Sequence, residues 1–264
     1  MEMNRRKFLK LGTAAVAGLG VAAASSNPAV AAAVEGSYKE SAGKRSDVTW
    51  GMVIDMKKMD EATLNKCIEA CHKFHNVPNI DTKKDEVKWI WGETFEHLFL
   101  DEVHDKMGDK YKDMSFMTIC NHCAEPVCVR VCPVKATFMN AQGIVGMDMH
   151  RCIGCRNCMA ACPYGARSFN YKNPRNYLDE INPSYPTRMK GVVEKCNFCS
   201  ERLAVGELPL CVEEAGGAII FGDINDPNSA ESKAIADNFT LQRRTNLGTK
   251  PKVFYIVFGG VDND

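Results

Sequence analysis

Apolar and polar positions alternate over short distances along most of the chain. Apolar stretches at 51–55, 143–148 and 218–221 have the length and side chains typical of strands. Helices are expected close to cysteine-rich stretches, at 159–161 and 201–205. The pattern therefore predicts short strands and short helices joined by loops.

Three further stretches have a recognisable pattern. The apolar segment at 253–261 is shorter than the roughly 20 residues of a membrane-spanning helix and is expected to be a buried strand. Residues 172–190 contain three prolines and no regular period, so we expect an irregular insertion that contacts a partner. Five large apolar side chains are expected to be core, with a quinone or partner-docking patch as the alternative: Trp89, Trp91, Phe95, Leu98 and Phe99.

The first 33 residues have the pattern of a signal peptide. A basic stretch precedes an apolar run at 11–24, and alanine-rich sequence follows. Arg5 and Arg6, with the following Lys-Phe-Leu-Lys, resemble the twin-arginine export motif. Because that route carries folded proteins, we expect a cofactor to be inserted before export and the mature chain to lie on the extracytoplasmic face of the membrane. Residues 34–48 are expected to be a polar linker.

Composition and charge fit a folded domain without a nucleic-acid partner. The chain has 264 residues, of which 45% are apolar and 25% are charged, so a packed core can form. Its 33 basic and 33 acidic residues give a formal net charge of zero, and no basic stripe stands out. Binding driven by nucleic-acid phosphates is therefore excluded.

The 13 cysteines form four groups, and their odd number means that disulfides cannot use all of them. The sequence CIGCRNCMAACP at 152–163 is the C-x2-C-x2-C-x3-C-P pattern of bacterial [4Fe-4S] ferredoxins. The sequence CNHCAEPVCVRVCP at 120–133 has two additional residues between its second and third cysteines. These two motifs predict iron–sulfur ligation.

The fourth cysteine of such a motif ligates the neighbouring cluster, so two motifs build two clusters by exchange. We name the predicted ligand sets quartet A, which is Cys120, Cys123, Cys128 and Cys162, and quartet B, which is Cys132, Cys152, Cys155 and Cys158. Zinc sites more often use two separated C-x2-C pairs. Disulfides require an oxidising compartment, which export would supply, but such closely spaced cysteines are poor bridge partners.

The chain resembles the four-cluster ferredoxin subunits that serve membrane-bound oxidoreductases, such as polysulfide, tetrathionate and dimethyl sulfoxide reductases. Besides the two motifs, the resemblance rests on CIEACHKFHNVP at 67–78, KCNFCSERLAVGELPLC at 195–211 and AIIFGDINDPNS at 218–229. It implies an α+β, duplicated bacterial-ferredoxin-like fold, with cluster-binding loops and insertions, over a domain at 49–264.

The family's four-motif pattern is incomplete here. Glu61, Leu64 and Ala215 stand where three of its ligand cysteines belong, and all three fall in one cluster, which retains Cys67 alone. The resemblance implies that a third set remains intact, quartet C, which is Cys71, Cys196, Cys199 and Cys211. We therefore expect three [4Fe-4S] clusters and a buried, unused Cys67. Attachment of haem c at Cys67, Cys71 and His72 is the alternative for this segment, whose spacing is one residue too long.

One branch of the family is especially similar, through KWIWGE at 88–93, RCIGCRNCMAACPYGARSFNY at 151–171 and TRMKGVVEKCNFC at 187–199. It is the extracytoplasmic iron–sulfur subunit of the heterodisulfide-reductase-like (Hdr-like) menaquinol oxidoreductase, subunit O of the Dsr MKJOP-type complex associated with sulfate respiration. The resemblance implies three kinds of partner: a multi-spanning quinone-interacting membrane subunit, a multihaem cytochrome c and heterodisulfide-reductase-like subunits.

The predicted function is a non-catalytic relay of single electrons. No nucleotide-binding loop, activated nucleophile or carboxylate pair stands out, and five histidines are assigned no role: His75, His97, His104, His122 and His150. Six cations near the motifs are expected to favour the reduced clusters: Arg130, Lys135, Arg151, Arg156, Arg167 and Lys195. The alternatives are the electron-transfer subunit of a molybdopterin reductase and, from another class, an exported binding module stabilised by zinc or disulfides.

Overall fold

The computed structural model describes residues 48–257, which all belong to the second of two compact units, Lys44–Asp264. The predicted signal peptide at 1–33 and the linker up to residue 47 lie outside the described residues. Within residues 48–257, no helix is long and apolar enough to cross a membrane.

A four-stranded sheet joins the two ends of the described chain, in the order β8-β1-β10-β9. Strand β1 (Trp50–Asp55) pairs in parallel with β10 (Val253–Ile256) and antiparallel with β8 (Ile219–Asp223). Strand β9 (Thr240–Leu241) pairs antiparallel with β10 at the edge. Because parallel neighbours need a long crossover, nearly the whole described chain runs between β1 and β10.

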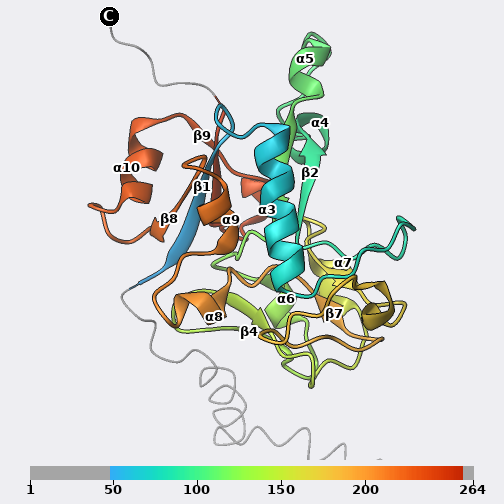
Figure 1. The fold of residues 1–264 in the computed structure, drawn as a ribbon. Helices are drawn as coiled ribbons and strands as arrows, with labels where there is room; N and C mark the ends of the chain where they lie inside the picture. Colours follow the sequence, from blue (N-terminus) through green and yellow to red (C-terminus); the bar gives the residue numbers. More distant parts are fainter. Residues whose placement is uncertain (1–47, 258–264) are drawn as a thin grey trace, which may run out of the picture. The chain divides into compact units, whose positions relative to one another are not determined.

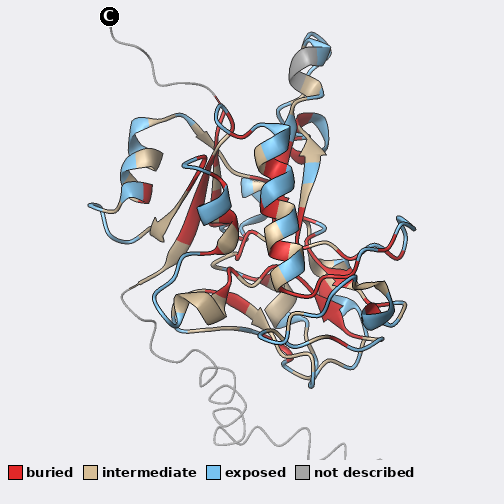
Figure 2. Cartoon of the chain, in the orientation of Figure 1, coloured by how far each residue is buried: buried red, intermediate tan, exposed pale blue. Residues whose placement is uncertain are grey.

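Helix α3 (Glu61–Phe74) leads from the sheet towards the cysteine motifs, as Figure 1 shows. Asp60 caps its N-terminus by accepting a hydrogen bond of 2.7 Å from the backbone N–H of Thr63. Its buried side chains, Leu64, Cys67 and Cys71, recur at intervals of three and four residues, which places them on one face. Figure 2 shows this buried stripe on a helix whose other residues are exposed or intermediate. The face packs against α9 (Leu210–Glu214) and β2 (Ile90–Thr94).

The cysteine motifs lie among short hairpins and helices in the lower half of Figure 1. Two antiparallel strand pairs lie there, β4 (Thr137–Met139) with β5 (Val145–Met147) and β6 (Ser168–Phe169) with β7 (Val193–Glu194), and a third, β2 with β3 (Ser115–Ile119), lies beside α3. The helices are α6 (Val127–Arg130), α7 (Asn157–Ala161) and α8 (Ser200–Leu203). The remaining elements are α4 (Phe95–Leu98), α5 (Asp109–Lys112), α10 (Ala230–Asp237) and the 3₁₀ turns η1 (Pro174–Tyr177) and η2 (Thr245–Leu247).

The predicted short elements are confirmed with small changes in their bounds. The strands expected at 51–55, 143–148 and 218–221 correspond to β1, β5 and β8, and the two expected helices correspond to α7 and α8. Helix α8 ends at Leu203 rather than at 205, because the chain turns into the loop that returns to α9. The strand expected at 253–261 is present as β10 over its first four residues, and residues beyond 257 lie outside the described part.

The apolar side chains at 89–99 belong mainly to the core, as expected from the sequence. Four of the five expected core side chains are buried: Trp89, Phe95, Leu98 and Phe99. The Phe99 and Tyr255 rings meet edge-to-face at 5.7 Å, which joins α4 to the central sheet. Trp91 is half-buried at the surface, with the Lys88 ammonium 4.9 Å from its ring.

The proline-containing insertion packs onto its own chain. Arg188 is 2% exposed, forms a buried ion pair with Glu194 and donates to the backbone oxygen of His75. Asn182 donates to the backbone oxygen of Phe74 at 2.8 Å and so fastens the insertion to the end of α3. The insertion is therefore ordered by intramolecular polar contacts.

Candidate iron–sulfur centres

The four cysteines of quartet A line one pocket, together with Val145, Tyr164 and Arg167. Cys120 directly follows β3, Cys128 lies in α6 and Cys162 is the C-cap of α7. The structure thus brings Cys162, from the second motif, to the pocket lined by the first three cysteines of the first motif.

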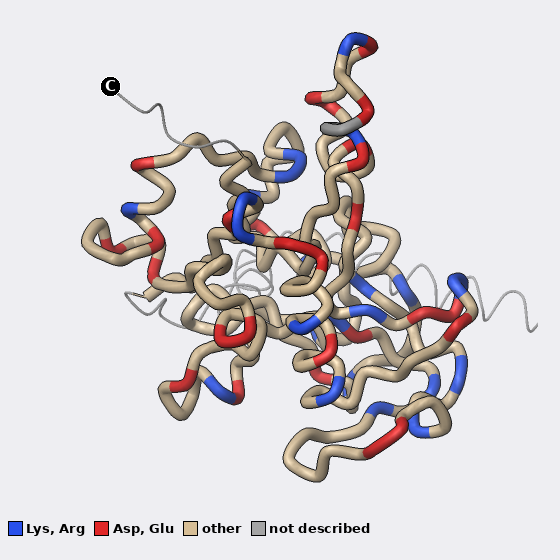
Figure 3. The backbone as a smooth tube through the Cα atoms, turned by 45° about the horizontal axis from the view of Figure 1, so that its top comes forward, with Lys and Arg blue, Asp and Glu red and all other residues tan. Residues whose placement is uncertain are grey.

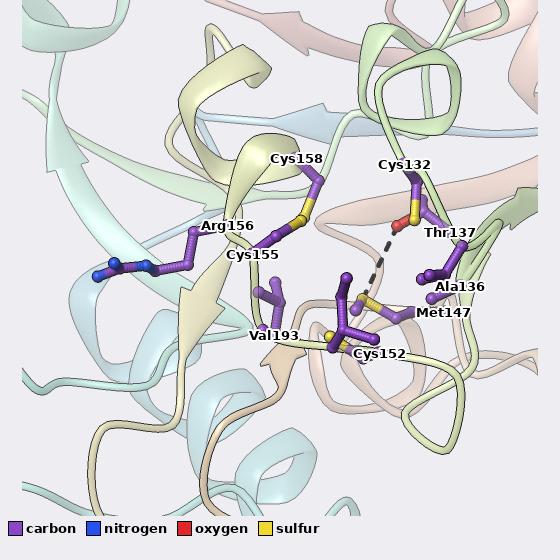
Figure 4. A pocket seen from close by; sticks show the side chains of 12 residues that line it. Cys132, Ala136, Thr137, Met147, Cys152, Cys155, Arg156, Cys158 and Val193 are labelled. Atoms are coloured by element: carbon purple, nitrogen blue, oxygen red, sulfur yellow. Dashed lines mark hydrogen bonds between the residues drawn. The ribbon is translucent and has the colours of Figure 1, made fainter. Parts of the chain in front are cut away.

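The four cysteines of quartet B line a second pocket, with Thr137 and Met147 on its wall. In Figure 4, Cys155 and Cys158 lie opposite Cys132, and the Arg156 side chain points away from the pocket. Cys155 is exposed, whereas Cys158 is buried. Quartet B therefore has one side close to solvent.

The loops of the second motif need a backbone conformation that favours glycine. Gly154 has φ of +71°, and a Cβ there would lie 2.4 Å from the backbone oxygen of Gly191. Arg156, two residues later, is also left-handed, with φ of +62°. These turns curl the chain so that consecutive cysteines face one pocket.

Quartet C is assembled from three distant parts of the chain. Cys71 lies on α3, Cys196 and Cys199 follow β7, and Cys211 lies on α9. All four are buried, with exposed fractions of 8% or less. Burial raises the pKa of the Cys71 thiol well above its ordinary value, and the three other thiols of the quartet raise it further. The structure therefore brings together the ligand set that the resemblance implied.

Most of the predicted ligands have thiols that are hard to ionise without a bound cation. Burial is the largest cause, and it raises the pKa of Cys123 to about 12 and that of Cys196 to about 12. At Cys132, burial is outweighed by hydrogen bonds from backbone N–H groups, including that of Thr137, and its pKa is lowered. Thiolates bind metals, so a cluster that replaces the thiol protons would relieve this penalty. Three converging sets of four thiols fit [4Fe-4S] ligation.

The fourth ligand set of the family pattern is replaced by core packing. Leu64 and Ala215 are each 4% exposed, and Cys67 is fully buried. The Cys67 thiol donates a hydrogen bond of 3.3 Å to the backbone oxygen of Cys211, and burial raises its pKa to about 11. Glu61 is exposed at the start of α3. Cys67 thus has the buried position that was expected of it.

Two histidines without a predicted role lie directly beside the cysteine sets. The His75 ring is fully buried, with Nδ1 2.8 Å from the backbone oxygen of Cys71 and Nε2 2.7 Å from Glu201. His122, between Cys120 and Cys123, stacks on Phe198 with ring centroids 3.7 Å apart. The four-residue spacing from Cys71 to His75 at the end of a helix could have indicated from the sequence that these two residues are in contact.

The stacking of His122 on Phe198 joins two cysteine motifs that are distant in sequence. His122 belongs to the C-x2-C loop of quartet A, and Phe198 to that of quartet C, so the stacked rings mark where the two sets meet. The Nδ1 atom of His122 accepts a hydrogen bond of 3.1 Å from the backbone N–H of Val145. Spacing alone could not identify this pair, because the rings meet through tertiary packing.

The six predicted cations fall into two groups. Arg130, Lys135, Arg151 and Arg156 are exposed, whereas Arg167 and Lys195 are 5% and 2% exposed. Figure 3 shows that basic and acidic residues both occur over most of the described chain. Exposed charges are screened by water and salt, so among these six cations Arg167 and Lys195 are expected to act most strongly on the cysteines.

Comparisons with known proteins agree with this donor set. A family model described as a 4Fe-4S dicluster domain matches residues 112–176, which include quartets A and B. The "Hdr-like menaquinol oxidoreductase iron-sulfur subunit 1" of Archaeoglobus fulgidus is 42% identical, over 98% of this chain and 99% of that protein.

Two further relatives cover most of the chain. A putative iron–sulfur subunit of a dimethyl sulfoxide reductase from Halobacterium salinarum is 37% identical, over 78% of each chain. The "Menaquinone reductase, iron-sulfur cluster-binding subunit" of Nitratidesulfovibrio vulgaris is 34% identical, over 81% of this chain and 90% of its own. The cysteine geometry and these similarities together show that the chain belongs to the family of ferredoxin-type iron–sulfur electron-transfer subunits that includes those of Hdr-like menaquinol oxidoreductases.

Proposed function

We propose that this chain relays single electrons through three [4Fe-4S] clusters within a membrane-bound menaquinol oxidoreductase complex linked to sulfate or sulfite respiration. The observation that carries the proposal is the convergence of twelve of the 13 cysteines into three sets of four. A [4Fe-4S] cluster accepts and releases one electron at a time. The chain itself supplies twelve thiolates, fixes their positions and buries five of them: Cys71, Cys158, Cys196, Cys199 and Cys211.

The arrangement supports a relay in the order C, A, B. Cys196 of quartet C lies close enough to Cys120 of quartet A for that thiol to raise the pKa of Cys196, after the larger effect of burial. Cys128 of quartet A has the same effect on Cys158 of quartet B, where burial is again the larger cause. Quartet A therefore holds the middle cluster of the relay. Because Cys155 is exposed, the cluster of quartet B is the one nearest to solvent.

The duplicated ferredoxin-like fold is part of the same proposal. In this proposal the two motifs exchange their fourth cysteines, and each is followed by one strand of a two-stranded antiparallel sheet, β4 after the first motif and β6 after the second. This repetition supports two related halves around quartets A and B. The absence of a fourth cluster follows from Leu64 and Ala215, whose apolar side chains cannot ligate iron.

The location and partners are proposed from the leader and the relatives. The twin-arginine motif supports export of the folded, cluster-loaded chain to the extracytoplasmic face of the membrane. The proposed partners are a multi-spanning quinone-interacting membrane subunit, a multihaem cytochrome c subunit and heterodisulfide-reductase-like subunits. A fusion of residues 1–33 to a reporter that requires twin-arginine export tests the first step. Loss of export in an Arg5→Lys, Arg6→Lys double variant is expected.

A second candidate is the electron-transfer subunit of a molybdopterin reductase, supported by the 37% identity to a putative dimethyl sulfoxide reductase subunit. Purification of the complex from membranes distinguishes the two. Haem c and heterodisulfide-reductase-like subunits in the complex support the menaquinol oxidoreductase, whereas molybdenum supports the alternative.

The decisive experiment for the relay is analysis of iron and acid-labile sulfide, with EPR, on protein purified without oxygen. Three clusters correspond to about twelve iron atoms per chain. About sixteen iron atoms would mean that a fourth cluster exists, and a colourless protein with zinc or disulfides would establish the binding-module alternative.

A further inference from the structure

The junction between quartets A and B contains a buried guanidinium. Arg167 lines the pocket of quartet A, and its Nη1 donates to Thr137 at 3.2 Å and to the Met147 sulfur at 3.5 Å. Thr137 and Met147 both line the pocket of quartet B, where Figure 4 shows them opposite Cys155. The Arg167 side chain therefore reaches from one pocket to the wall of the other.

Among the described residues, the positive charge of Arg167 has no carboxylate partner. It takes part in none of the ion pairs seen between residues 48 and 257. Its Nη2 is buried and has no hydrogen-bond partner among the described residues. Burying a charge without compensation costs several kcal/mol, so an anion is expected beside it. The cysteine quartets are the neighbouring groups that become anionic when they bind iron.

The neighbouring thiols agree with this placement. Burial by itself would lower the pKa of Arg167, but Cys128 and Cys158 outweigh it and raise the pKa above the ordinary value. These two cysteines belong to quartets A and B respectively, so the guanidinium is influenced by both sets.

The junction between quartets A and C contains a buried ammonium in a comparable position. Lys195 donates to the backbone oxygen of Cys196, a member of quartet C, at 2.7 Å, and also to that of Val145. Val145 lines the pocket of quartet A and binds His122 through its N–H. Lys195 likewise takes part in none of the ion pairs seen in the described part of the chain.

We propose that Arg167 and Lys195 help to set the relative potentials of the relay, each by raising the reduction potentials of the two clusters that it separates. Reduction adds one negative charge to a cluster, and a fixed cation nearby stabilises that charge without taking up a proton. Quartet A borders both cations, so its cluster gains from both, whereas those of quartets B and C gain from one each. The proposal rests on the three-cluster relay proposed above.

The test is an EPR-monitored potentiometric titration with dithionite on the purified full chain. The signals are assigned with Cys155→Ala, which removes the cluster of quartet B, and Cys71→Ala, which removes that of quartet C. A unit charge within roughly 10 Å at an effective dielectric constant near 20 changes a one-electron equilibrium by about tenfold. That factor corresponds to about 59 mV.

Each variant has a distinct expected pattern. Arg167→Gln is expected to lower the reduction equilibrium constants of clusters A and B by about tenfold and to leave that of C unchanged. Lys195→Gln is expected to lower those of A and C and to leave that of B unchanged. Arg167→Lys restores a charge and is expected to recover most of the loss. Arg156→Gln, which removes an exposed cation next to Cys155, is the matched control and is expected to change little.

Several results would overturn the proposal: unchanged potentials in both glutamine variants, a change confined to one cluster in either variant, or an equal effect of Arg156→Gln. If Arg167→Gln fails to incorporate iron, Arg167→Met, which preserves much of the side-chain length without charge, takes its place in the same titration. Iron analysis of the unmodified chain distinguishes a failure of the three-cluster relay from a failure of the proposed role of the two cations. Fewer or more than three clusters contradicts the relay itself, whereas three clusters with unmoved potentials contradicts the role of the two cations alone.

Discussion

Cys67 and Cys71 provide a sharp test of the ligand assignment, because they lie one turn apart on the same face of α3 and are both buried. Only Cys71 is assigned to a cluster. Replacing each with alanine removes the same sulfur atom from the same helix, so the two variants differ mainly in whether a ligand has been lost.

The Cys71→Ala variant is expected to lose about four of about twelve iron atoms, together with the matching sulfide. The cluster that it loses is also held by Cys196, which is 125 residues away in sequence. Cluster binding stabilises the folded state, so the free energy of unfolding is also expected to fall markedly. The remaining buried thiols of quartet C would then be protonated, since burial holds their pKa values high.

The Cys67→Ala variant is expected to retain all of its iron. It loses one buried hydrogen bond, from the thiol to the backbone oxygen of Cys211, and the packing of one sulfur atom. Those losses together correspond to about 1–3 kcal/mol of unfolding free energy. Iron and sulfide analysis with anaerobic chemical denaturation measures both quantities. Equal iron loss in the two variants would refute the assignment of quartet C.

Three further predictions concern the fold around the sites. Burial, followed by the charge of Asp223, raises the pKa of Glu231 to about 8, so the folded state holds this proton more tightly than the unfolded state. Its contribution to stability is complete below about pH 4.5 and is lost as the pH rises to about 8; Glu231→Gln should flatten this part of a denaturation series across pH, and an unchanged slope would contradict the shift. Gly154→Ala should destabilise the chain by more than about 1 kcal/mol, because the added Cβ would meet a backbone oxygen at 2.4 Å, whereas Gly165→Ala, with φ of +63° but no atom within 4 Å, should cost less in the same measurement. Arg188→Met leaves the buried Glu194 carboxylate without its cationic partner and should cost about 3–5 kcal/mol in chemical denaturation, and a smaller cost would argue that the ion pair is dispensable.

The cysteine spacing was sufficient to predict quartets A and B as groups. A C-x2-C-x2-C motif curls locally, so three of its thiols face one point whatever the rest of the chain does, and the fourth follows in a short helix. The short strands were also predictable from local apolar patterns. In contrast, the pairing of β1 with β10 was not, because it joins residues that are about 200 positions apart and no local pattern encodes such a partner.

The sequence by itself determined which chemistry the chain can perform. The number, spacing and flanking prolines of its cysteines are properties of the chain that need no tertiary structure to be recognised. The resemblance also indicated that one ligand set was missing, and which side chains stand in its place.

The tertiary structure decided how the sites are related to one another. It placed Cys71 beside Cys196, stacked His122 on Phe198, and buried two of the six candidate cations while leaving four in water. The physical reason is that electrostatic effects depend on distance and on the surrounding dielectric, and both quantities exist only after distant segments pack together.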